Sequence, residues 1–186
     1  MAKQVCPGLT IAMDNILTGG GVNIIWVPSG TMTARTTNGA AAGSTETTTN
    51  KVMLKTLDFA DGSNKLYAQF NVLMPSEWDG GTITARFVWT SASTSTNSVV
   101  WGLQGASVGD NEAADAIFGT AKTVSQANSS SAYNVRVTSE TSPITINNAN
   151  PGEWVVFQVF RDPTDAADTL AATASLLGLS VYWLSS

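Results

Sequence analysis

The clearest pattern along the chain is an alternation of apolar and polar side chains between residues 64 and 104. A period of two is typical of β-strands that bury one face. Three runs show this period of two. Their apolar residues are Leu66, Ala68, Phe70 and Val72 in the first run, Ile83, Ala85, Phe87 and Trp89 in the second, and Val99, Trp101 and Leu103 in the third. The segments between them are rich in turn-forming residues. We therefore expect strands at 66–73, 82–90 and 99–106.

Similar runs predict strands elsewhere, at 22–27, 52–59, 118–124, 133–138, 143–146, 154–161 and 179–183. The run 154–161 is apolar on both faces, which predicts a central strand. Residues 39–49 have few bulky side chains and are expected to form a mobile loop, and 169–177 permit a short helical turn. About eight to ten strands at this spacing predict an all-β, two-sheet antiparallel sandwich of jelly-roll-like type.

The aromatic residues mostly follow the same alternation. We expect the following to point inward: Phe70, Phe87, Trp89, Trp101, Trp154, Phe160 and Trp183. Trp78 lies in the turn 75–81, where capping of the core is the favoured interpretation. The alternation allows the rings of Trp26 and Tyr182 to be exposed, so a platform on which a sugar ring stacks stays an open alternative for these two residues.

The N-terminal part differs from the rest of the chain. Residues 1–21 are weakly apolar and end in three glycines, so we expect an N-terminal arm that gains order by docking. Residues 22–186 then form a single β-sandwich domain. The one cysteine, Cys6, lies in the arm, where inert packing is favoured over reactivity. No long apolar leader precedes the domain, which predicts synthesis in a cytoplasm.

Charge and composition narrow the function. Charged residues make up 12% of the chain, the net charge is −5, and no basic cluster occurs. This argues against a nucleic-acid partner and against cationic attraction to a membrane. The chain has no histidine, which excludes Ser-His-Asp catalysis and His-ligated zinc.

Acidic residues are the remaining candidates for chemistry. Asp110, Glu112 and Asp115 do not have EF-hand spacing, so a solvated turn is favoured. Asp162, Asp165 and Asp168 recur every third residue; they either bind calcium, or cap a turn and pair with Arg161. Neither Glu77 with Asp79 nor Glu112 with Asp115 is placed to face another carboxylate across a cleft. We therefore predict no catalytic, cofactor-binding or metal-binding residues, and no enzyme.

Two blocks of sequence resemble a known group. YAQFNVLMPSEWDGGTITARFVWTS with SVVWGLQGASVGDNEA, and the later WVVFQVFRDPTDAADTLAATASLLGLSVYW, are similar to small jelly-roll proteins of tailed bacteriophages, over residues 52 to 184. The resemblance implies a virion protein of the capsid decoration (cement) type, a homotrimer bound to the major capsid protein and assembled in the host cytoplasm. The alternative it implies is a tail-fibre, receptor-binding head, which we would expect to recognise host glycans through loops 91–98 or 125–132.

Overall fold

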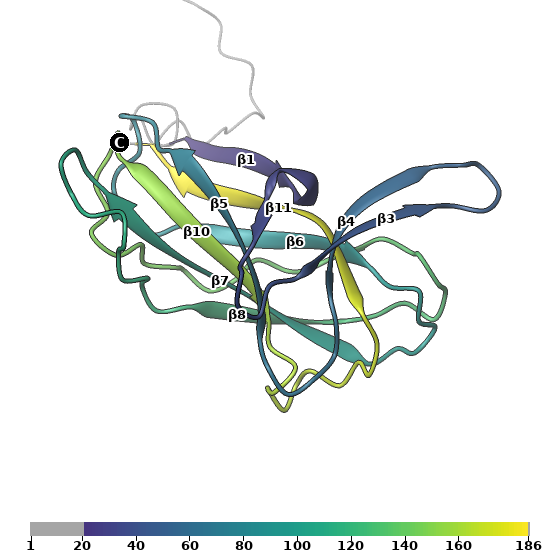
Figure 1. Cartoon of the computed structure of the whole chain (residues 1–186). Coiled ribbons are helices and arrows are strands. Elements are labelled where there is room, and N and C mark those ends of the chain that lie inside the picture. Colours follow the sequence, from purple (N-terminus) through teal and green to yellow (C-terminus); the bar gives the residue numbers. More distant parts are fainter. Residues whose placement is uncertain (1–20, 186) are drawn as a thin grey trace, which may run out of the picture.

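A computed structural model describes residues 21–185, and these residues form two antiparallel sheets (Figure 1). The first sheet has the order β3 (Ala41–Glu46), β4 (Met53–Phe59), β11 (Ala174–Leu184), β6 (Thr84–Thr90) and β9 (Arg136–Val137), and β1 (Val22–Pro28) also pairs with β11. The second has the order β2 (Thr33–Ala34), β5 (Leu66–Leu73), β10 (Trp154–Arg161), β7 (Ser98–Val108) and β8 (Lys122–Ala127). A single 3-10 turn, η1 (Ser29–Thr31), follows β1.

The order of the strands confirms the predicted fold class. Within the described range, every connection crosses from one sheet to the other, except the hairpins β3–β4 and β7–β8. Alternation of successive strands between two packed antiparallel sheets is the arrangement of a jelly-roll-type sandwich. Of the predicted arm, residues 1–20 lie outside the described residues.

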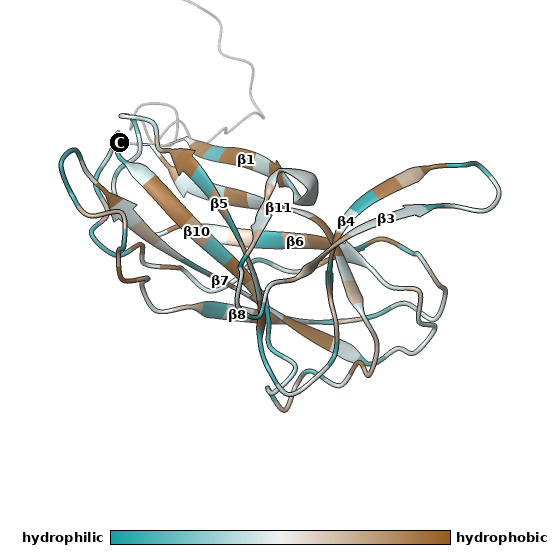
Figure 2. Cartoon of the chain, in the orientation of Figure 1, coloured by the Kyte–Doolittle hydropathy of each residue, from teal (hydrophilic) through white to brown (hydrophobic). Residues whose placement is uncertain are grey.

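The core lies between the sheets and is centred on Trp101. The ring of Trp101 packs against Phe59, Phe87 and Trp89 at centroid distances of 5.1, 5.8 and 6.1 Å. Trp78 is fully buried, which confirms that it caps the core. Apolar residues concentrate on the strands, whereas the tip of the β3–β4 hairpin is hydrophilic and projects from the body (Figure 2).

Strand β10 is central, as its two apolar faces predict, because it pairs with β5 on one side and β7 on the other. Its inward residues are Val155, Phe157 and Val159. The predicted inward phase of Trp154 and Phe160 is therefore wrong. Trp154 is 37% exposed, and Phe160 is buried on the outer face, over the bare backbone of Gly102.

The loop predicted at 39–49 is also wrong, because most of it is strand β3, paired along its length with β4. Small side chains misled the prediction. At Gly43 a Cβ would lie 2.2 Å from the hydroxyl of Thr56 and 2.3 Å from the carboxylate of Asp58, which hydrogen-bond to each other at 2.9 Å. The absence of a side chain here lets the two strands pair.

Four other segments differ from the prediction. No helical turn forms at 169–177, because β11 begins at Ala174 and pairs with β4. The strand predicted at 118–124 is displaced to 122–127. In 133–138 only β9 forms, and Tyr133, Val135 and Val137 are 44%, 56% and 51% exposed. The strand predicted at 143–146 is reduced to an isolated bridge between Ile144 and Ile83.

Candidate functional site

The acidic residues after β10 have structural partners. Arg161 is fully buried, and its guanidinium donates to both carboxylate oxygens of Asp168, at 2.9 and 2.7 Å. It also donates to the carbonyl oxygens of Phe59, Leu170 and Ala172. Asp168 in turn accepts the N–H of Val100 at 3.0 Å. This ion pair therefore joins β4, β7, β10 and the segment before β11.

The other two carboxylates of the triplet point to different partners. Asp162 pairs with Lys65 at 2.7 Å and accepts from the N–H and hydroxyl of Thr164. Burial alone would raise the pKa of Asp162, but the hydrogen bonds from Lys65 and Thr164 outweigh burial and lower it. Asp165 accepts the N–H of Ala167 at 2.9 Å. These contacts match the second interpretation of Asp162, Asp165 and Asp168, in which the carboxylates cap a turn and pair with Arg161. No group of three potential metal ligands occurs in residues 21–185.

The remaining acidic candidates lie in exposed turns. Glu112 accepts the N–H of Gly109 at 2.9 Å, and Asp79 accepts that of Gly81 at 2.7 Å. Glu77 and Asp110 are exposed. Glu112 and Asp115 line one shallow hollow beside Asn147 and Asn148. Turn closure thus uses one carboxylate of each pair that sequence reasoning had considered.

The two loops considered for glycan binding are held by their own polar groups. The hydroxyls of Ser91, Ser93 and Ser95 accept the N–H groups of Ser93, Ser95 and Asn97 in turn. Asn128, in the neighbouring loop, donates to the carbonyls of Ser93 and Ser95 at 3.0 and 2.9 Å. Many of the loop hydroxyl and amide groups that were expected to bind a sugar therefore form hydrogen bonds within the protein.

A more distinctive surface is the outer side of β1 and β11. Because Val22 pairs with Leu184 and Ile24 with Tyr182, their side chains share that side of the sheet. We call Val22, Ile24, Trp26, Tyr182 and Leu184 the β1/β11 face. Val22, Ile24, Trp26 and Leu184 are 70%, 57%, 48% and 48% exposed. Gly178 leaves room for the Trp26 ring to lie across β11, since a Cβ there would sit 2.5 Å from it.

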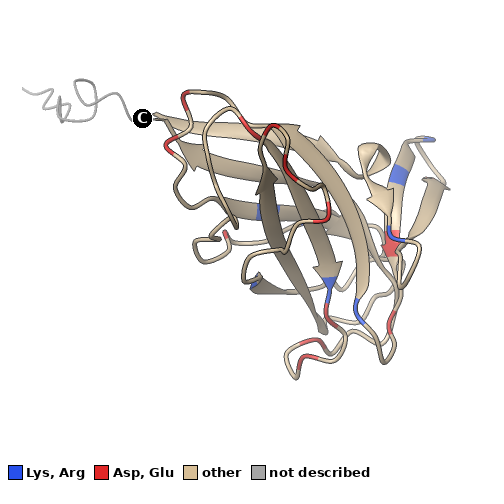
Figure 3. Ribbon diagram, turned by 60° about the vertical axis from the view of Figure 1, so that its left-hand side comes forward, with Lys and Arg blue, Asp and Glu red and all other residues tan. Residues whose placement is uncertain are grey.

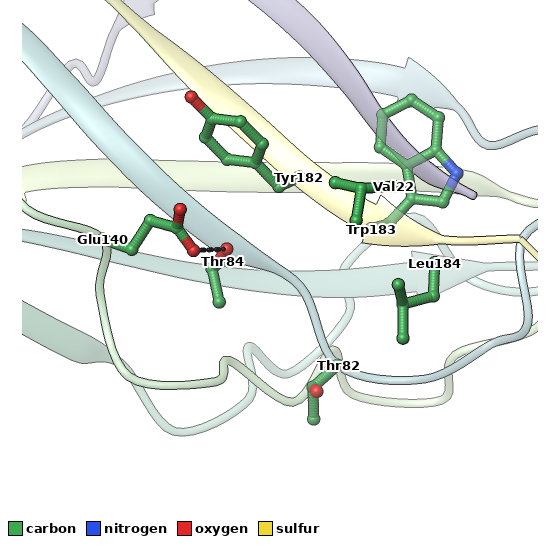
Figure 4. A pocket seen from close by; sticks show the side chains of 7 residues that line it. All are labelled: Val22, Thr82, Thr84, Glu140, Tyr182, Trp183 and Leu184. Atoms are coloured by element: carbon green, nitrogen blue, oxygen red, sulfur yellow. Dashed lines mark hydrogen bonds between the residues drawn. The ribbon is translucent and has the colours of Figure 1, made fainter. Parts of the chain in front are cut away.

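A hollow of about 280 Å³ lies at one end of this face (Figure 4). Val22, Tyr182 and Leu184 line it together with Thr82, Thr84 and Glu140. Glu140 accepts from Thr84 at 3.0 Å and pairs with Arg86 at 2.8 Å, and Arg86 lies 5.6 Å from the Tyr182 ring centre. Thr84, Arg86 and Glu140 are thus engaged with one another, and the lining left exposed is mainly apolar.

Strand β1 is also an open sheet edge. Among the described residues it pairs with β11 alone, so a row of its backbone N–H and C=O groups points away from the sheet. Figure 3 shows that charged residues gather mainly in loops and at strand ends. Strand β1 itself contains no charged residue. The edge therefore has few of the charges that usually protect exposed strands from pairing with another chain.

No helix long and apolar enough to cross a membrane occurs in the described part of the chain. No family profile and no curated protein matches the sequence. Several solved structures are similar in fold. A family 35 carbohydrate-binding module of Abf62 from Cellvibrio japonicus is 11% identical with a TM-score of 0.47, covering 87% of this chain and 92% of that one.

Two more structures show the range of the likeness. A family 11 carbohydrate-binding module from Clostridium thermocellum is 6% identical with a TM-score of 0.40, covering 89% of each chain. The enzymatically active domain of tailspike protein 4 from bacteriophage CBA120 is 7% identical with a TM-score of 0.35, covering 90% of this chain and 19% of that one. At these levels the likeness carries no argument about function. The strand order alone defines the chain as a β-sandwich protein of jelly-roll type.

Proposed function

We propose that this chain is a non-enzymatic structural protein of a tailed-bacteriophage virion, a capsid decoration protein that assembles as a homotrimer on the major capsid protein. The observation that carries the proposal is the β1/β11 face on an open strand edge. The resemblance of 52–184 to phage jelly-roll proteins supplies the biological setting.

An apolar face on an unpaired edge is costly for a protein that stays alone in water. Exposed apolar patches rimmed by polar residues mark interaction sites, and open edges invite pairing with another chain. The surrounding surface is poor in charge, so a partner would desolvate few ions on docking. Both properties suit a protein whose task is to fit against neighbours.

A second apolar patch supports a ring of copies. Val52, Tyr133 and Val135, which we call the hairpin patch, are 52%, 44% and 56% exposed. A hollow of about 580 Å³ separates the β3–β4 hairpin from residues 132–135 at this place. A head-to-tail ring needs two different complementary surfaces on each copy, whereas a twofold dimer needs one self-complementary surface.

The assembly can be tested by measuring the mass of the purified full chain in solution at micromolar concentration. We expect a trimer, which Ile24→Asp in the β1/β11 face or Val135→Asp in the hairpin patch reduces to a monomer. Thr123→Asp, on the exposed face of β8, is the matched control and should remain trimeric.

Mixing the two interface variants makes the test sharper. Each keeps one intact patch, so a head-to-tail contact predicts a heterodimer that cannot close into a ring. The wild-type chain should also co-sediment with expanded phage heads, and Ile24→Asp should do so poorly. A wild-type monomer that fails to bind heads would refute the proposal.

A further inference from the structure

The outer face of the five-stranded sheet has three glutamines side by side. Gln158 of β10 lies directly opposite Gln69 of β5 and Gln104 of β7. The Oε1 atom of Gln158 accepts from Nε2 of Gln69 at 3.1 Å and from Nη1 of Arg35 at 3.4 Å. We call Gln69, Gln158 and Gln104 the glutamine row; its middle member is held in place on two sides.

The row retains unused hydrogen-bonding capacity. Each glutamine amide has two N–H donors and a carbonyl acceptor. Within residues 21–185, Nε2 of Gln158 donates to no protein group although the residue is 4% exposed, and the half-buried amide of Gln104 makes no hydrogen bond. Neither amide is among the fully buried, unpartnered side-chain atoms of the described residues, so both are within reach of a ligand from outside the chain.

An aromatic hollow adjoins the row. Residues 114–118 pass over the same face of the sheet and enclose about 240 Å³. Gln69 belongs to both the row and the hollow. The other walls include Ala106, Asp115, Phe118, Trp154 and Val156. Trp154 is 37% exposed, so part of its indole is available to a ligand.

We propose that the glutamine row and this hollow together bind a short stretch of a neutral glycan chain. The flat apolar side of one pyranose ring packs on Trp154 in the hollow. Gln158 lies four residues along β10 from Trp154, a span of about 13 Å. The hydroxyl groups of the neighbouring ring therefore exchange hydrogen bonds with the amides of Gln104 and Gln158. A volume below the roughly 300–1,000 Å³ of drug-sized pockets suits one ring with its neighbours outside.

The charges near the site favour a neutral sugar. Asp115 accepts hydrogen bonds from hydroxyl groups but repels an acidic sugar. Among the described residues, no Lys or Arg lines the hollow, so a phosphate or carboxylate ligand there would meet Asp115 and no cation. This activity goes beyond the proposed function, because it gives an assembly protein a means of adhering to glycans.

The test uses the ¹⁵N-labelled full chain, titrated with tetrasaccharides of glucose, mannose, galactose and xylose, and with tetragalacturonate as the acidic comparison. We expect saturable shifts of the glutamine side-chain amide signals and of one tryptophan indole signal for at least one neutral sugar. Trp154→Ala and Gln104→Ala should each weaken binding about tenfold, without changing the backbone spectrum elsewhere. Gln104→Ala keeps the test decisive should Trp154→Ala fold poorly.

Two matched controls locate the site. Thr123→Ala on the same sheet and Trp26→Ala on the β1/β11 face should leave the affinity unchanged. The inference is overturned if no neutral sugar gives saturable shifts, if tetragalacturonate binds as tightly, or if Trp26→Ala rather than Trp154→Ala abolishes binding. None of these results depends on trimer formation or head binding, so the two proposals fail separately.

Discussion

Removal of the buried Arg161 guanidinium should destabilise the fold more than any change to a surface charge. Arg161 makes five hydrogen bonds, two to Asp168 and three to backbone carbonyls, and neither side chain of the pair is exposed. Arg161→Met leaves the Asp168 carboxylate buried with only the N–H of Val100. Breaking such a pair costs about 3–5 kcal/mol, or roughly 6–20 °C in melting temperature for a chain of this size.

Urea unfolding, followed by tryptophan fluorescence, measures this cost. The double variant Arg161→Met with Asp168→Leu should recover part of it, because an apolar pair avoids the stranded carboxylate. It should not recover all of it, because the carbonyls of Phe59, Leu170 and Ala172 still lack a donor. Lys51→Met is the control, since the pair of Lys51 and Glu46 is 67% and 50% exposed and should contribute less than about 1 kcal/mol.

The reasoning fails if Arg161→Met loses no more stability than Lys51→Met. It fails equally if the double variant is as unstable as the sum of the two single variants, because residues in one buried network should couple.

Three further predictions concern single sites. The pKa of Asp162 is lowered in the folded state, so its contribution to stability is complete above the unfolded pKa of about 3.9 and is lost as pH falls through the folded value. Lys65→Met should therefore destabilise the protein at pH 6, by less than about 1 kcal/mol. The unfolding curves of Lys65→Met and of the wild type should converge towards pH 2. Gly178→Ala should lower the free energy of unfolding in urea by about 1–3 kcal/mol, because its Cβ would meet the Trp26 ring at 2.5 Å and the Val27 carbonyl at 2.7 Å. Adding Trp26→Ala should restore only part of this stability. Full stability of Gly178→Ala alone would contradict the prediction. Calcium or a chelator should leave the melting temperature unchanged, because Asp162, Asp165 and Asp168 face separate partners; a calcium-dependent rise would show a site that these contacts do not explain.

The alternation of side chains was a reliable guide where a strand buries one face. The alternating runs at 66–73 and 82–90 match β5 and β6 closely, and the run 154–161, which is apolar on both faces, matches β10. It misled where backbone pairing rather than side-chain burial makes the strand. β3 is built of Ala, Gly, Ser and Thr with a final Glu and shows little period. Residues 133–138, by contrast, alternate well and yet form a strand over only two residues.

The candidate surfaces were harder to predict, because they depend on register. The glutamine row joins residues 69, 104 and 158 from three strands, and nothing local in the sequence sets the pairings that align them. Trp26 and Tyr182, by contrast, could be singled out from their phase alone. That both lie on one face follows only from the pairing of β1 with β11.

The two ends of the described chain are hydrogen-bonded to each other. The N–H of Gly21 donates to the hydroxyl of Ser185 at 3.0 Å, and the N–H of Ser185 donates to the carbonyl of Gly21 at 3.2 Å. A short linker joining residue 185 to residue 21 would therefore cyclise the domain. A circular permutant could then have its new termini at the hydrophilic tip of the β3–β4 hairpin, around Thr48. Force applied at residues 21 and 185 would separate β1 from β11 one residue pair at a time, so the sandwich should yield there before its centre.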